Sequence, residues 1–71
     1  MSVKYRLSKE PGEENIVYRM TEDKTGLKCD MWFRYKKQWG HHPDAYGAFA
    51  GFNSSKAISE EEAMKIVNGE N

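Results

Sequence analysis

The chain has 71 residues, with 11 Lys and Arg matched by 11 Asp and Glu, so its formal net charge is zero. A chain of this length is expected to form one domain, residues 1–71, and zero net charge argues against a strongly basic nucleic-acid binder. The single cysteine, Cys29, excludes an internal disulfide and the class of disulfide-stapled secreted domains. Neither an N-terminal apolar signal segment nor an apolar run of about 20 residues occurs, so we expect a cytoplasmic protein without membrane contact.

Three stretches near the N-terminus alternate between apolar and polar residues, as half-buried strands do. They cover residues 3–7, 15–20 and 27–36. The turn residue Pro11 and the loop glycine Gly26 separate them, and the connections are short. Short connections favour an antiparallel meander, because parallel strands need a longer crossover.

The stretch 27–36 is expected to be the central strand, because it is the longest run rich in aromatic and apolar residues. Its alternation sends two sets of side chains to opposite faces of the sheet. The set expected to point inward is Cys29, Met31, Phe33 and Tyr35. The set expected to point outward is Asp30, Trp32, Arg34 and Lys36.

The segment after this strand contains more turn-forming residues. Residues 38–46 hold Gly40 and Pro43, which predict a loop. In residues 45–52 the alternation of aromatic and alanine positions predicts a short edge strand, although Gly47 and Gly51 weaken it. Residues 53–56 are polar and predict a linker.

A C-terminal helix is predicted near residues 59–68. Ser59 followed by Glu62 three residues later forms a capping box, and Gly69 provides a stop. The expected fold is therefore α+β: a three- or four-stranded antiparallel sheet, a meander, with one C-terminal helix packed on one face. The expected core is Tyr5, Leu7, Ile16, Tyr18, Met31, Phe33, Ile58, Ala63, Ile66 and Val67.

The face opposite this helix is the candidate binding surface. We expect it to gather basic side chains around one tryptophan, namely Lys4, Arg6, Arg19, Trp32, Arg34 and Lys36. Cations attract phosphates, and an exposed aromatic ring can stack on a base. The competing interpretation is a solvated face whose charges only keep the protein soluble.

Two functional hypotheses follow from that surface. The first is a non-catalytic module that binds nucleic acid or another anionic partner. The second is a protein-interaction factor without nucleic-acid contact, such as a small inhibitor, an adaptor or a homodimer joined through an edge strand at 45–52.

The predicted three strands and C-terminal helix resemble the DNA-binding domain of plant ethylene-response factors and the arm-binding domain of tyrosine integrases. The segment 52–63, which ends in Ser59-Glu60-Glu61-Glu62-Ala63, is similar to the way those domains enter their helix. The resemblance covers about the last third of the chain, and the tryptophan and glycine spacing of those families is not matched. It implies that basic and aromatic sheet residues would enter the major groove.

Metal and enzyme chemistry have weaker support in the sequence. His41, His42, Asp44 and Cys29 are residue types that ligate metals, but paired Cys-x-x-Cys and His-x-x-x-His spacings do not occur. Cys29 is placed among apolar side chains, where a thiol is a poor nucleophile. We therefore expect no catalytic residue, metal or cofactor.

Overall fold

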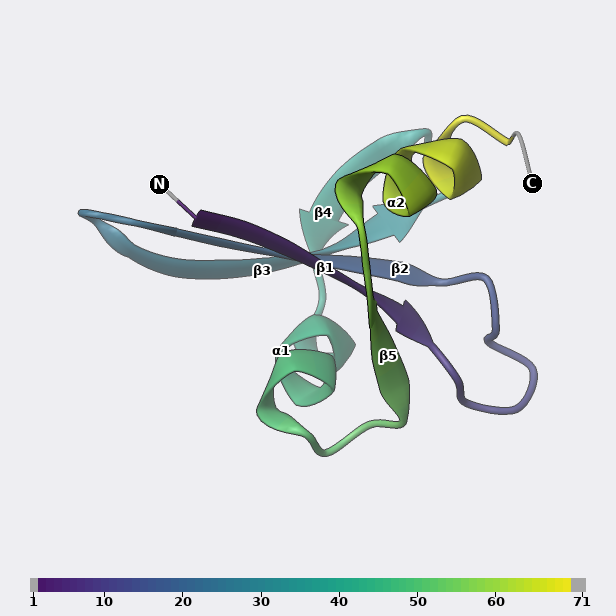
Figure 1. The fold of residues 1–71 in the computed structure, drawn as a ribbon, viewed down its shortest axis with the longest axis horizontal. Helices are drawn as coiled ribbons and strands as arrows, with labels where there is room; N and C mark the ends of the chain where they lie inside the picture. Colours follow the sequence, from purple (N-terminus) through teal and green to yellow (C-terminus); the bar gives the residue numbers. More distant parts are fainter. Residues whose placement is uncertain (1, 70–71) are drawn as a thin grey trace.

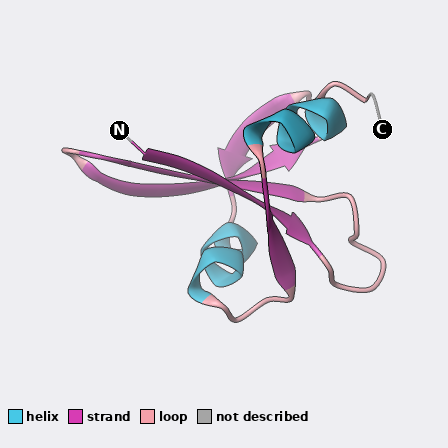
Figure 2. Cartoon of the chain, viewed as in Figure 1, coloured by secondary structure: helices cyan, strands magenta, loops and turns pink. Residues whose placement is uncertain are grey.

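The computed structural model describes residues 2–69, which form a five-stranded antiparallel sheet with two helices (Figure 1). The elements, coloured by type in Figure 2, are β1 (Ser2–Ser8), β2 (Val17–Asp23), β3 (Gly26–Phe33), β4 (Gln38–His41), α1 (Pro43–Ala50), β5 (Ser55–Ile58) and α2 (Glu60–Val67). The order of strands across the sheet is β4-β3-β2-β1-β5. The two helices lie on opposite sides of the sheet (Figure 1). No helix within residues 2–69 is both long enough and apolar enough to cross a membrane.

The predicted α+β class and antiparallel pairing are confirmed, since β1 to β4 pair consecutively as a meander. The C-terminal helix is also confirmed, together with its capping box: the Ser59 side chain accepts from the Glu62 backbone N–H, and the Glu62 carboxylate accepts from the Ser59 backbone N–H. The number of strands and helices was wrong. The sheet gains β4 and β5, which form its edges and fall in segments predicted to be loop and linker.

The edge strand predicted for residues 45–52 is wrong, because this segment forms α1. Pro43 occupies the first turn, where its missing N–H costs nothing, and Gly51 closes the helix with a φ of 88°. Ala45 and Ala48 are buried three residues apart, which is helical spacing. The segment 45–52 therefore offers no edge strand through which two copies could pair.

The core consists of two layers, one on each face of the sheet. Under α1, the buried side chains Tyr18 and Cys29 contact Ala45 and Ala48. Four partly buried side chains complete this layer: Ile16, Met20, Met31 and Phe49. The predicted inward directions of Tyr18, Cys29 and Met31 are thus confirmed.

The second layer lies on the α2 face and includes Val17 and Ala63, both fully buried. The prediction that Tyr5 and Leu7 share a core with Tyr18 is wrong. In the sheet Tyr18 is paired with Arg6, while Leu7 is paired with Val17. Alternation tells which residues of one strand share a face, but only the register between strands tells which faces coincide.

The third strand ends earlier than predicted, at Phe33 rather than near residue 36. Residues 34–37 form the turn to β4, in which Lys37 has a φ of 54°. Tyr35, predicted to point inward, is instead 80% exposed. The Phe33 ring is only partly buried and covers the backbone of Gly40 in the neighbouring strand.

Candidate functional site

The six residues predicted to form one binding surface lie on different parts of the molecule. Lys4 and Arg6 are on the α1 face, since they pair with Met20 and Tyr18. Arg19 and Trp32 are on the opposite face, the one that carries α2. Arg34 and Lys36 lie beyond the end of β3, in the turn. The basic sheet face implied by the resemblance to the groove-binding domains is therefore not formed.

Arg6 acts within the fold. Its Nε donates to Ser55 Oγ at 2.7 Å, and its terminal NH2 donates to the Ser55 carbonyl at 2.8 Å. These bonds attach β5 to β1 beside their backbone pairing. The Arg6 guanidinium thus holds the edge strand β5 in place, and Arg6 is not part of the candidate site.

Arg19 is held between a carboxylate and an indole ring. Its NH2 group lies 3.2 Å from Asp30 Oδ2, and its guanidinium carbon lies 4.3 Å from the centre of the Trp39 ring. Asp30 is buried, with 2% of its surface exposed. This geometry combines an ion pair with a cation–π contact, so Arg19 stabilises the sheet.

Trp32 has a ring orientation fixed by its neighbours. It meets Trp39 edge to face at 5.4 Å between ring centres, and Trp39 meets Tyr5 at 6.2 Å. Arg19 packs on the Trp39 ring, and Trp39 in turn contacts Trp32. Trp32 is therefore partly buried, and its ring has a defined neighbour. A ring held in this way is preorganised for stacking.

The strongest local concentration of positive charge is the turn after β3. We call it the basic turn: Arg34, Tyr35, Lys36 and Lys37. In the described part of the chain none of its three cations forms an ion pair. The Lys36 ammonium lies 5.5 Å from the centre of the Phe33 ring and 5.7 Å from that of Tyr35. The turn therefore presents cations together with an exposed aromatic ring.

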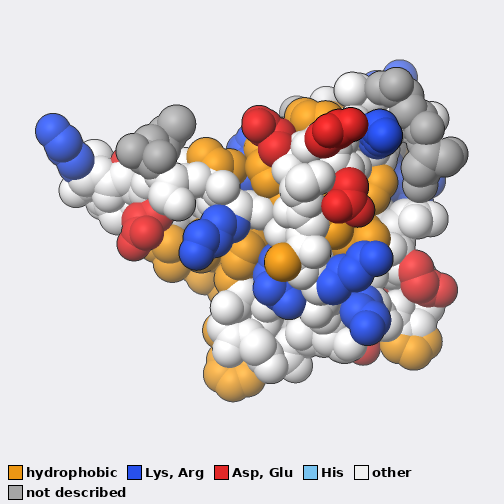
Figure 3. Space-filling view, in the orientation of Figure 1, with side chains coloured by type: hydrophobic (Ala, Val, Ile, Leu, Met, Phe, Trp, Pro, Cys, Tyr) orange, Lys and Arg blue, Asp and Glu red, His pale blue; other side chains and the backbone are white. Residues whose placement is uncertain are grey.

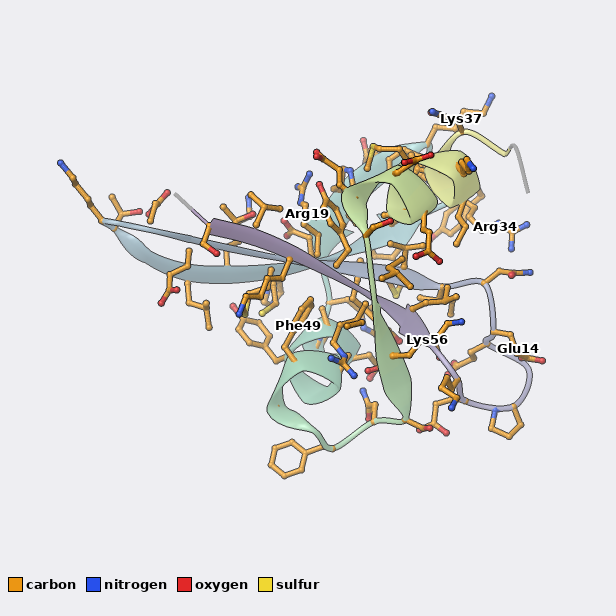
Figure 4. All side chains as sticks on the ribbon, in the orientation of Figure 1. Glu14, Arg19, Arg34, Lys37, Phe49 and Lys56 are labelled. Carbon is orange, nitrogen blue, oxygen red and sulfur yellow. The ribbon has the colours of Figure 1, made fainter. Side chains whose placement is uncertain are left out.

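A groove of about 520 Å³ lies between the basic turn and the C-terminal end of α2. Trp32, Arg34 and Lys37 line its sheet side, and Ile66 and Val67 line its helix side. Figure 4 shows Arg34 and Lys37 at this end of α2, with Arg19 apart from them.

Of the predicted site, only Trp32 and Arg34 thus line one groove. Lys36 extends over the Phe33 and Tyr35 rings instead, and Lys4, Arg6 and Arg19 lie elsewhere. Sequence reasoning missed Tyr35 and Lys37. The available signal was the charge run itself, Arg-Tyr-Lys-Lys, which contains no acid and is typical of a turn as much as of a strand end.

Acidic charge is concentrated elsewhere. Glu60, Glu61 and Glu62 occupy the first turn of α2, where they favour the positive end of the helix dipole. Figure 3 shows acidic side chains gathered over α2, with Lys and Arg spread over the rest of that face. The neutral total charge therefore conceals a local basic region at the β3–β4 turn.

The two histidines and the cysteine have structural surroundings. His42 Nδ1 accepts a hydrogen bond from the Asp44 backbone N–H at 3.1 Å and caps α1, while His41 packs edge to face on Tyr46. Burial raises the pKa of the Cys29 thiol, and the Asp30 carboxylate raises it further. Among residues 2–69 no three His, Cys, Asp or Glu side chains converge as metal ligands.

Comparisons with known proteins add no identity: no family model matches the sequence, and no curated protein or solved structure is significantly similar to it.

Proposed function

We propose that this protein is a non-catalytic binding module whose basic turn contacts the phosphate backbone of a nucleic acid. The observation that carries the proposal is the basic turn itself, three cations and an 80% exposed tyrosine within four consecutive residues. Phosphate contacts by Lys and Arg supply most of the sequence-independent affinity for nucleic acids. An exposed aromatic beside them adds stacking on a base.

Contacts with its neighbours restrain the backbone of the turn. The Lys36 backbone N–H donates to the Phe33 carbonyl at 3.2 Å, and Phe33 contacts both Tyr35 and His42 through ring edges and faces. The backbone of the turn therefore loses less conformational entropy on binding than that of an unconstrained loop, which favours affinity.

The test is a titration of the protein into labelled single-stranded and duplex oligonucleotides at two salt concentrations. We expect affinity to fall steeply with salt, because bound counterions are released. The triple variant Arg34→Gln, Lys36→Gln, Lys37→Gln should lower the slope of log K against log salt by roughly 2–3, since each phosphate contact contributes about 0.7–0.9.

A matched control carries the same change in net charge elsewhere. Lys9→Gln, Lys24→Gln, Lys56→Gln removes three exposed cations from other parts of the surface. The control should bind like the parent. If both triple variants lose affinity equally, or if the parent does not bind at low salt, the basic turn is not a nucleic-acid site.

The second candidate, a protein-interaction factor without nucleic-acid contact, is favoured by the outer side of α1. Tyr46 is 40% exposed there, Phe52 just beyond the helix is 87% exposed, and Asp44 is the only charged residue of α1. Exposed aromatics of this kind are frequent in protein interfaces. Light scattering after size exclusion tests self-association through this side, and Phe52→Ser should abolish any dimer found.

A further inference from the structure

We infer that the groove between β3 and α2 holds one unpaired base, so that the protein selects single-stranded over duplex nucleic acid. This inference rests on the proposed function and names the form of nucleic acid that it requires. The groove volume of about 520 Å³ is within the range of roughly 300–1,000 Å³ found for small-molecule sites. Its lining combines three kinds of group that a nucleotide needs.

The first kind is an apolar wall for the face of the base. Trp32 forms one side, and Ile66 and Val67 of α2 form another. All three are partly exposed, and Trp32 is fixed by its edge-to-face contact with Trp39. A flat heterocycle that enters between an indole and aliphatic side chains loses water on both faces, which is the physical basis of single-strand stacking sites.

The second kind is positive charge along the groove. Arg34 and Lys37 line it, and both belong to the basic turn. Arg34 and Lys37 are only three residues apart, so together they would attract the phosphates on either side of the inserted nucleotide.

The third kind is a pair of side-chain amides. Asn15, from the segment before β2, and Asn68, at the C-cap of α2, both line the groove. An amide offers a donor and an acceptor side by side, the pattern that base edges match. In a duplex those edges are paired and the base faces are stacked, so only an unpaired base can enter.

An acidic peptide is the main rival occupant, since it too would meet Arg34 and Lys37. The apolar wall and the two amides favour a base over a carboxylate, because a carboxylate cannot stack on the indole face and offers no donor to the amide oxygens. We therefore assign the groove to a nucleobase and treat the peptide as an outcome of the test.

The experiment measures binding by fluorescence anisotropy with three labelled probes of the same length, roughly 12 nucleotides, which is within the usual span of small single-strand sites. The probes are a single strand, its duplex, and the same strand made entirely of abasic sugar-phosphate units. We expect the single strand to bind at least about tenfold more tightly than the other two.

Trp32→Leu should weaken single-strand binding roughly 5- to 150-fold, as expected for the loss of one stacked base. Tyr46→Leu is the matched control, since it removes an exposed aromatic from α1 on the opposite face, and it should bind like the parent. If Trp32→Leu does not fold, Asn15→Ala and Asn68→Ala, at exposed positions, should each change the ranking of adenine-, cytosine- and thymine-only strands.

Failure of the inference and failure of the proposed function look different. Equal, salt-dependent binding of single strand, duplex and abasic strand would overturn the base site and leave the basic turn as a phosphate site. Competition by poly-glutamate as strong as by the unlabelled single strand would also overturn it. No binding to any probe at low salt would remove both proposals.

Discussion

Asp30 carries a charge in the interior of a very small protein, and its cation is not fully buried. The carboxylate is 97% covered, whereas the Arg19 side chain is 27% exposed. Within residues 2–69, Asp30 Oδ1 and Arg19 Nε have no hydrogen-bond partner. Because these two polar atoms are buried without hydrogen bonds, the cost of removing them from water offsets part of the attraction between the charges. The ion pair therefore contributes less to stability than its short distance suggests.

A single variant and a double variant test this description. Arg19→Met leaves Asp30 buried with only Lys28 at 4.0 Å, and we expect a loss of about 3 kcal/mol of unfolding free energy, the lower end for a broken buried pair. Arg19→Met with Asp30→Leu should recover more than half of that loss, because no buried charge remains. Urea denaturation measures both.

Arg34→Met is the control for the arginine-to-methionine change, since Arg34 is exposed and should shift stability by no more than about 0.5 kcal/mol. A double variant no more stable than Arg19→Met would contradict this account, because it would show that the unpaired Asp30 carboxylate costs no stability.

The sequence could predict part of this residue-scale chemistry. Alternation correctly placed Cys29 and Met31 together, and Asp30 and Trp32 together on the other face. It could not predict that Asp30 is buried, since a charged residue between apolar neighbours normally faces water. Burial of Asp30 depends on Arg19, which lies opposite it in β2 and whose guanidinium packs on the Trp39 ring of β4, so it requires both strands to pair with β3.

At the level of elements, the β3–β4 hairpin depends on an aromatic ring packed over a glycine. A Cβ at Gly40 would lie 2.6 Å from Phe33 Cε2, which is too close for any side chain. We expect Gly40→Ala to lower the unfolding free energy by about 1–3 kcal/mol through overpacking. In the double variant Gly40→Ala, Phe33→Leu, the loss of unfolding free energy should be smaller than the sum of the losses in the two single variants, as thermal unfolding would show. Strict additivity would mean that the ring does not cover Gly40 in solution.

The α2 helix depends on its N-terminal cap. The Ser59 hydroxyl accepts from the Glu62 backbone N–H at 3.1 Å. Ser59→Ala should cost about 1 kcal/mol, whereas Ser54→Ala, at an exposed serine outside both helices, should cost less than about 0.5 kcal/mol. Chemical denaturation of the two variants gives the comparison. Equal effects would indicate that the capping box does not limit stability.

The two helices also show what local signals can and cannot predict. The capping box made α2 predictable, because Ser59 and Glu62 act within one turn. α1 was missed because its sequence, Pro-Asp-Ala-Tyr-Gly-Ala-Phe-Ala, satisfies alternation and helical spacing at once. The contacts of Ala45 and Ala48 with Tyr18 and Cys29 select the helix, and those contacts are tertiary.

For the whole molecule, burial of two weak acids predicts sensitivity to alkali. Burial raises the pKa of Tyr18, and the carboxylates of Asp44, Glu13 and Glu10 add to it, although a hydrogen bond with Ser8 opposes them. The Cys29 pKa is raised in the same direction. Both groups hold their protons more strongly when folded, so the free energy of unfolding should fall as pH rises above the ordinary values of about 8.5 for thiols and 10 for phenols.

Equilibrium unfolding between neutral and strongly alkaline pH measures this loss. Tyr18→Phe cannot lose a phenolic proton, so its stability should decline less than that of the parent over the same range. Cys29→Ala provides the corresponding control for the thiol. Parallel curves for the parent and both variants would place the alkaline sensitivity in other groups.

The α+β class, the antiparallel meander of the first strands and the capped C-terminal helix could be predicted from the residues alone, because each follows from interactions between residues close along the chain. Contacts between distant residues were needed to establish which strand faces coincide, that a second helix covers the other face, and where the cations gather. Strand register decides these points, since a shift by one residue would exchange the two faces of a strand. The candidate site is therefore not a basic sheet face. It lies at the turn after β3, where Trp32, Arg34 and Lys37 line a groove with the end of α2.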